Sequence, residues 1–160
     1  SAVDTTDMAQ GLSGASLREH LEVRAMLEVE AARLAAQRRT PEDQERIFAA
    51  LALRGERPDK RRKDVFIEHD LAFHRAVVDA AHNPALGKLY GFFARAVRAT
   101  LKGMMARPDL PEPDYAAHAA VAEAIARRDP EGAAQAAREL LQPILDALDP
   151  LPPPPAPSEA

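Results

Sequence analysis

The chain has 160 residues, a formal net charge of -4 and no cysteine, which excludes disulfide frameworks, thiolate metal sites and cysteine nucleophiles. Its length suits a single domain with its own core, and its acidic balance argues against a protein that clamps nucleic acid over its whole surface. No apolar run reaches the about 18 residues of a membrane span, and no export signal precedes the first helix, so we expect a cytoplasmic protein without membrane contact.

Prolines and turn-forming residues divide the chain into segments whose apolar residues recur at intervals of three and four, the spacing of one helix face. Aromatic residues make up only 4% of the chain, a composition typical of close-packed helices, and no segment alternates like a strand. We therefore predict an all-α fold with one domain over residues 17–148, a linker at 1–16 and a Pro-rich disordered tail at 149–160. The predicted helices cover residues 16–38, 41–54, 59–81, 84–105, 112–128 and 130–148.

Two of these helices begin with a recognisable cap. Thr40 precedes Pro41, and Asp129 precedes Pro130; a side-chain oxygen followed by proline at the first helical position is typical of a helix N-terminus. Pro143, in contrast, falls inside the last apolar stripe, and we expect it to kink that helix or to end it early.

The first predicted helix places an arginine among its apolar positions. Arg24 shares a stripe with Leu17, Leu21 and Leu34, so its guanidinium points toward the interior. Two interpretations stay open. Arg24 forms an i, i+4 ion pair with Glu28 at the edge of the core, or it presents a planar fork to the carboxylate or phosphate of a ligand.

The third predicted helix carries an ionisable pair on the same face as its aromatic residues. Asp70 and His74 lie one turn apart on a stripe with Phe66 and Phe73, so both point inward. Either they only satisfy each other by a hydrogen bond, as buried polar groups usually do, or they offer an oxygen and a nitrogen to one metal ion. His118 lies on the apolar stripe of the fifth predicted helix and is a third candidate ligand, although a lone histidine there is more often a core residue.

Six short segments follow one another along the predicted domain. They are EVRAMLE (22–28), AARLAA (31–36), TPED (40–43), DLAFH (70–74), AAHNPAL (80–86) and HAAVAEAI (118–125). In this order and at these separations the chain resembles the FCD domain, the ligand-binding C-terminal domain of GntR-type bacterial transcription regulators of the FadR branch. The resemblance spans about Leu17 to Leu148, nearly all of the chain that we expect to be ordered.

The resemblance implies an antiparallel helical bundle with a central cavity that binds a small organic acid as effector. We expect the first, third, fifth and sixth predicted helices to line this cavity, with Arg24 orienting the anionic effector. Many members also hold a divalent metal by an aspartate and a histidine one turn apart and two later histidines. Asp70, His74 and His118 match the first three ligands, whereas Leu140 stands at the fourth. We therefore expect a weakened site for Zn, Ni or Mn, in which water or the effector's carboxylate takes the fourth position.

Members of the family also carry an N-terminal winged helix-turn-helix that reads two-fold operator DNA as a homodimer. This chain begins with linker-like residues instead. We therefore expect the effector-sensing, dimeric half of a repressor or activator, not an enzyme, which contacts operator DNA only through a missing N-terminal domain. Two other functions stay open: a metal-dependent hydrolase built on the same three ligands, and a ligand-free helical dimerisation module whose polar cluster only satisfies the core.

Overall fold

The computed structural model describes residues 16–56, 62–96, 98–111 and 113–148. These residues form helices and turns, with no strand among them, which confirms the all-α prediction. The predicted helix at 84–105 corresponds to two helical segments, Pro84–Ala96 and Arg98–Met105, and residue 97 between them lies outside the described residues. The expected linker and tail lie outside the described residues apart from Ser16, which caps the first helix. The helices are α2 (Leu17–Arg38), α3 (Pro41–Arg54), α4 (Lys63–Ala80), α5 (Pro84–Ala96), α6 (Arg98–Met105), α7 (Tyr115–Ala126) and α8 (Pro130–Ala147).

Local side-chain chemistry sets the helix starts as predicted. The Thr40 side chain accepts a hydrogen bond from Asp43 N (3.1 Å), and the Asp43 carboxylate accepts one from Thr40 N (2.8 Å), so α3 begins with a capping box. Asp129 caps α8 by accepting a hydrogen bond from Gly132 N (2.9 Å). α8 continues past Pro143, so this proline does not end the helix early; its ring lies on the exposed side.

The Asp43 carboxylate also ties α3 to the turn that follows α4. His82 Nε2 lies 2.5 Å from Asp43 Oδ2, and Arg46 Nη2 lies 2.5 Å from Oδ1. His82 has a φ of 48°, in the left-handed region that lets the chain reverse between α4 and α5. Burial alone would raise the pKa of Asp43, but hydrogen bonds from Thr40, His82 and Arg46 lower it to about 2. This carboxylate is therefore a source of stability that is lost in acid.

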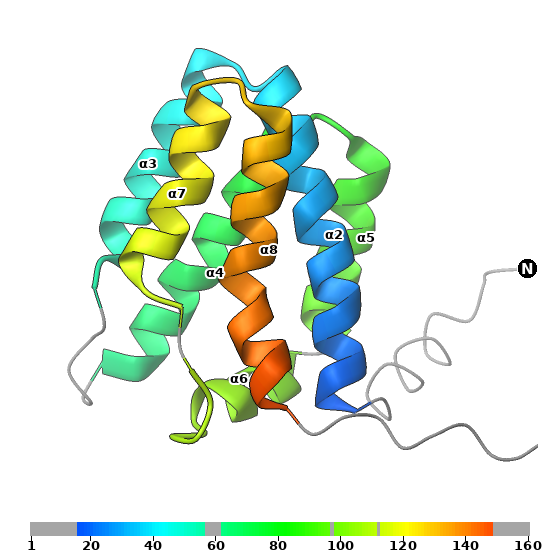
Figure 1. Cartoon of the computed structure of the whole chain (residues 1–160), viewed down its shortest axis with the longest axis vertical. Helices are drawn as coiled ribbons and strands as arrows, with labels where there is room; N and C mark the ends of the chain where they lie inside the picture. Colours follow the sequence, from blue (N-terminus) through cyan, green and yellow to red (C-terminus); the bar gives the residue numbers. More distant parts are fainter. Residues whose placement is uncertain (1–15, 57–61, 97, 112, 149–160) are drawn as a thin grey trace, which may run out of the picture.

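Five helices enclose the main core. α2 packs against α4, α7 and α8, and α3 packs against α4 and α7 (Figure 1). Alanines such as Ala35 and Ala133 are fully buried where these helices meet, and their small side chains let the backbones approach closely. Larger side chains, among them Phe73, Ile125 and Leu141, fill the space between the helices. Helices α2, α4, α7 and α8 therefore surround the polar groups described below.

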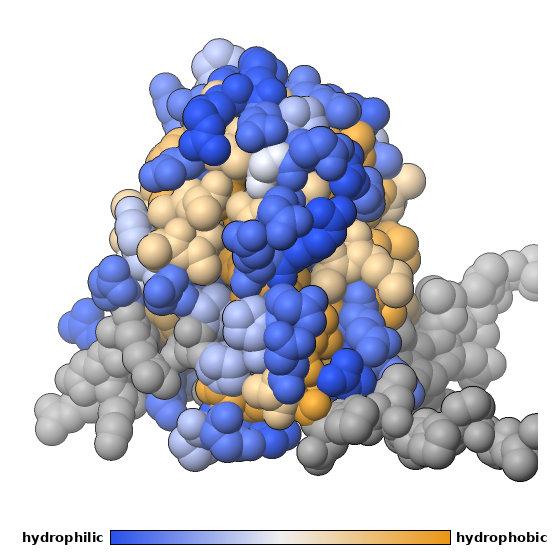
Figure 2. Space-filling model, viewed as in Figure 1, coloured by the Kyte–Doolittle hydropathy of each residue, from blue (hydrophilic) through white to orange (hydrophobic). Residues whose placement is uncertain are grey.

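The outer face of α8 is hydrophilic. Figure 2 shows a band of hydrophilic residues down the middle of the face seen in Figure 1, over this helix. Gln135, Arg138 and Glu139 are exposed, whereas Ala137 and Leu140 are buried. This division places Leu140 on the inner face of α8, beside the centre of the bundle.

Candidate functional site

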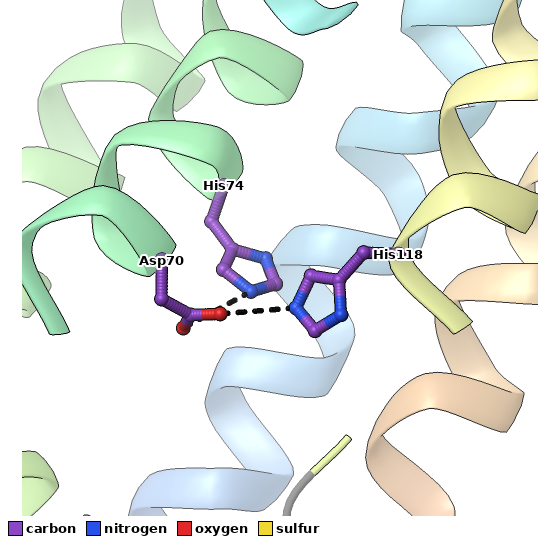
Figure 3. A group of neighbouring side chains, drawn as sticks. All are labelled: Asp70, His74 and His118. Atoms are coloured by element: carbon purple, nitrogen blue, oxygen red, sulfur yellow. Dashed lines mark ion pairs between the residues drawn. The ribbon is translucent and has the colours of Figure 1, made fainter. Parts of the chain in front are cut away.

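Three side chains from two helices meet in the interior. Asp70 and His74 project from successive turns of α4, and His118 projects from α7 (Figure 3). Their exposed fractions are 6%, 5% and 1%, so all three point inward as their spacing predicts. Asp70 Oδ2 lies 3.6 Å from His74 Nε2, and Asp70 Oδ1 lies 3.0 Å from His118 Nε2. One ligand atom from each residue lies within 4.8 Å of the other two, which is close enough for a single metal ion.

The orientation of the two rings favours a cation. His118 Nδ1 is 2.8 Å from the carbonyl oxygen of Asp114, which can only accept, so we assign the His118 proton to Nδ1. Figure 3 shows each imidazole turning one nitrogen toward Asp70 and the other away. His118 Nε2 is buried and, among the described residues, forms no hydrogen bond although it lies beside a carboxylate oxygen. Two acceptors facing each other repel, and a dication between them would satisfy both; these residues therefore fit a metal ion.

Asp70 has a further partner at the end of α3. Arg54 Nε donates to Asp70 Oδ1 over 2.6 Å. The same guanidinium donates to the carbonyl oxygens of Pro113 (2.7 Å) and Gly55 (3.0 Å) and lies 4.7 Å from the centre of the Phe66 ring. Arg54 therefore neutralises Asp70 and joins α3 and α4 to the segment before α7, while Oδ2 remains directed at His74.

A second buried carboxylate lies on the other side of His74. Glu28 Oε1 is 3.2 Å from His74 Nδ1, 3.1 Å from Arg24 Nε and 2.9 Å from the Tyr90 hydroxyl. The pair of Arg24 with Glu28 that the spacing allows is therefore present. Arg24 is 6% exposed, yet its two terminal nitrogens form no hydrogen bond with the described part of the chain. This leaves the fork of the guanidinium available to an anion.

The buried groups keep their charges at neutral pH. Burial would raise the pKa of Glu28, but Arg24 and His74 lower it to about 2. Burial also acts to raise the pKa of Asp70, yet the positive charge of Arg24 acts to lower it, and the pKa lies well below its usual range. Burial lowers the pKa of His118, which favours the neutral imidazole that a metal ion requires.

A small cavity lies beside His74, between α2, α4, α7 and α8. These are the four helices that the sequence predicts around the effector cavity. The volume left for the centre of a water molecule is about 10 Å³, room for at most one water. An organic acid does not fit until the lining side chains move. Leu140 shares this lining with His74 and has no atom that can bind a metal. The lining residues are Glu28, Ala32, Phe73, His74, Val77, Val121, Ala137 and Leu140.

Sequence reasoning missed two residues of this centre, Arg54 and Tyr90. Arg54 follows Ile47 and Leu51 at intervals of four and three, so it continues the buried stripe of α3. Tyr90 precedes the buried Phe93 by three residues on α5 in the same manner. Both spacings place a polar group inward, and this signal could have marked them as candidates.

The structure defines an all-helical domain with a buried polar centre. Comparison with models of known protein families identifies the family of this domain. The model of the FCD domain matches residues 19–143, most of the chain, and the chain therefore belongs to the FCD domain family. The FCD domain is the C-terminal effector-binding domain of regulators of the GntR family. A comparison with curated proteins finds no match. Among the described helices, none is both long and apolar enough to cross a membrane.

Proposed function

We propose that this chain senses a small organic acid together with a divalent metal and thereby controls DNA binding by a winged helix-turn-helix of the parent regulator. The observation that carries the proposal is the buried group of Asp70, His74 and His118, whose ligand atoms lie within 4.8 Å of one another. Membership of the FCD domain family supports an effector-binding role.

Asp70, His74 and His118 would hold the metal. Two imidazoles and one carboxylate suit Zn, Ni or Mn. When bound, the ion supplies positive charge and an open coordination position in a water-poor interior. Leu140 withholds a fourth protein ligand, so that position falls to water or to the effector's carboxylate. The Nδ1 contacts of His74 and His118 orient the rings for this role.

Arg24 would hold the carboxylate of the acid. Its Nε is engaged by Glu28, and its two terminal nitrogens have no hydrogen-bond partner in the described residues. Two parallel N–H groups match the two oxygens of a carboxylate. Because the cavity near His74 holds only about 10 Å³, the acid binds a wider arrangement of the four helices around it. Selection of that arrangement is how binding alters the regulator.

We also propose that the domain forms a homodimer, because regulators of this family read two-fold operators. The parent protein, through its N-terminal domain, contacts the DNA. Light scattering at tens of micromolar protein tests the dimer, and a monomeric mass would count against it.

Metal content and thermal stability test the function together. The protein is dialysed mildly, its Zn, Ni and Mn are measured, and its unfolding temperature is recorded with a panel of small organic acids, with and without each metal. We expect retained metal and a rise in unfolding temperature with specific acids. His74→Ala should abolish metal retention, whereas His69→Ala, on the same helix but outside the site, should not. A protein that retains no metal and responds to no acid would contradict the proposal.

A further inference from the structure

Glu28 lies between the two halves of the proposed site. Its Oε1 contacts Arg24 Nε (3.1 Å), His74 Nδ1 (3.2 Å) and the Tyr90 hydroxyl (2.9 Å). These partners come from α2, α4 and α5, and the Glu28 side chain is only 7% exposed. A single buried oxygen therefore joins the arginine that would hold the acid to a histidine that would hold the metal.

The contact with Glu28 determines which nitrogen of His74 carries the proton. His74 Nδ1 lies 3.2 Å from Glu28 Oε1, and because a carboxylate can only accept, we assign the His74 proton to Nδ1. Nε2 is then left with a lone pair directed at Asp70 Oδ2, 3.6 Å away. A carboxylate on the far nitrogen of a histidine fixes the ring and makes the near nitrogen a stronger ligand. Glu28 is thus a positioning residue for His74.

Arg24 donates a hydrogen bond to the same oxygen of Glu28 that contacts His74. While Nε donates to Glu28, the terminal nitrogens stay without a partner in the described residues. A carboxylate bound to those nitrogens shares the positive charge of the guanidinium. The attraction of Arg24 for Glu28 Oε1 weakens as a result, and more of the negative charge on Oε1 is available to His74.

We propose that Glu28 couples the two sites: an anion on Arg24 strengthens the contact of Glu28 with His74 and raises metal affinity at Asp70, His74 and His118. By linkage, the metal raises anion affinity by the same factor. This inference rests on the function proposed above, since it needs both an anion at Arg24 and a metal at His74. Coupling between sites is typically 5–150-fold, and we expect about tenfold here.

Zinc titration calorimetry with and without acetate measures this coupling. Ionic strength is matched with chloride, and free zinc is corrected for acetate binding. In the wild-type protein acetate should tighten zinc binding about tenfold. Glu28→Gln keeps an acceptor of the same shape but removes the charge. Zinc affinity should then fall by about tenfold without acetate, and the acetate effect should shrink to within about twofold.

Two control variants separate coupling from general damage. Glu30→Gln makes the same chemical change on the same helix at an exposed position, and it should leave zinc affinity and the acetate effect unchanged. Tyr90→Phe removes a donor that competes with His74 for Glu28 Oε1. It should not lower zinc affinity, whereas a merely structural role of the Glu28 cluster would lower it.

The outcomes distinguish this inference from the proposed function. If the tenfold acetate effect persists in Glu28→Gln, the acid acts directly on the metal, so the coupling role of Glu28 is wrong while the proposed function stands. If wild-type protein binds no zinc, the metal half of the proposed function fails and the coupling with it.

A measurement on wild-type protein keeps the inference testable even if Glu28→Gln does not fold. Nitrogen-15 NMR of the metal-free protein reports which nitrogen of each histidine is protonated. We expect His74 to carry its proton on Nδ1, facing Glu28, and His118 to carry its proton on Nδ1, facing the Asp114 carbonyl. A proton on Nε2 of His74 would overturn the role of Glu28.

Discussion

Replacing Arg54 by methionine tests whether the guanidinium and a metal ion share one carboxylate. Arg54 is 4% exposed and donates to Asp70 Oδ1 over 2.6 Å. Methionine retains much of the aliphatic volume beside Phe66, so the loss of packing is small. Removal of one partner from a buried ion pair leaves the other charge uncompensated. We therefore expect the metal-free variant to lose about 3–5 kcal/mol of unfolding free energy.

Zinc should affect the variant more strongly than the wild type. In the wild-type protein a dication and the Arg54 guanidinium both depend on the negative charge of Asp70, and they repel each other. At an effective dielectric constant of about 20, such a repulsion over a few ångströms amounts to several kcal/mol before relaxation. If only a part of this repulsion remains after the protein relaxes, its removal in Arg54→Met raises zinc affinity by at least about tenfold, equivalent to about 1.4 kcal/mol. Zinc should thus restore part of the stability that the substitution removes.

Urea unfolding followed by far-UV circular dichroism, with and without saturating zinc, measures both effects. Arg75→Met is the matched control, because Arg75 forms an exposed pair with Asp79 (3.0 Å), and it should cost less than about 1 kcal/mol. The reasoning is refuted if Arg54→Met costs as little as the control. It is also refuted if zinc stabilises the variant less than the wild type, because Arg54 would then support the metal site instead of competing with it.

Three further predictions follow from the same contacts. Leu140→His adds an imidazole to the cavity lining beside His74 and should raise zinc retention through dialysis; unchanged retention would show that position 140 is too far from the ligands. Arg24→Met should abolish stabilisation by organic acids in thermal unfolding, and unchanged affinity for every acid would leave Arg24 only its pair with Glu28. The folded-state pKa of Asp43, about 2, lies below its ordinary 3.8, so its stabilising effect is present above pH 3.8 and is lost as pH falls toward 2. Acid should therefore remove about 2 kcal/mol, a loss that Asp43→Asn should not show in pH-dependent urea unfolding.

Much of the fold could be predicted because local chemistry decides it. Thr40 and Asp129 mark helix starts through side-chain oxygens that satisfy free backbone N–H groups, whatever the rest of the chain does. Inward placement of Asp70 and His74 follows from one-turn spacing on an apolar stripe, which needs no tertiary information. The predicted span of 130–148 matches α8, but the expectation that Pro143 could end the helix early is wrong, because buried residues on the inner face hold the helix together despite the missing hydrogen bond.

The contacts of the site depend on packing that no local pattern contains. Arg54 meets Asp70 across 16 positions of sequence, and Tyr90 meets Glu28 across 62. A stripe predicts that each of these side chains is buried, but only the arrangement of the helices determines its partner. The size of the cavity has the same origin, because it depends on side chains from four helices. For this reason the sequence predicts the lining helices and fails to predict that they close to about 10 Å³.

The balance of buried charge explains why a metal and an acid would be bound together. Arg24 and Arg54 supply two positive charges, Glu28 and Asp70 supply two negative ones, and all four residues are buried, with exposed fractions of 6% or less. A dication alone would leave excess positive charge in a water-poor core, and an acid alone would leave excess negative charge. Each ligand reduces the electrostatic penalty of the other, even where the two do not touch. Glu28 adds a direct contact between the two sites to this general electrostatic effect, because the oxygen that faces Arg24 also faces His74.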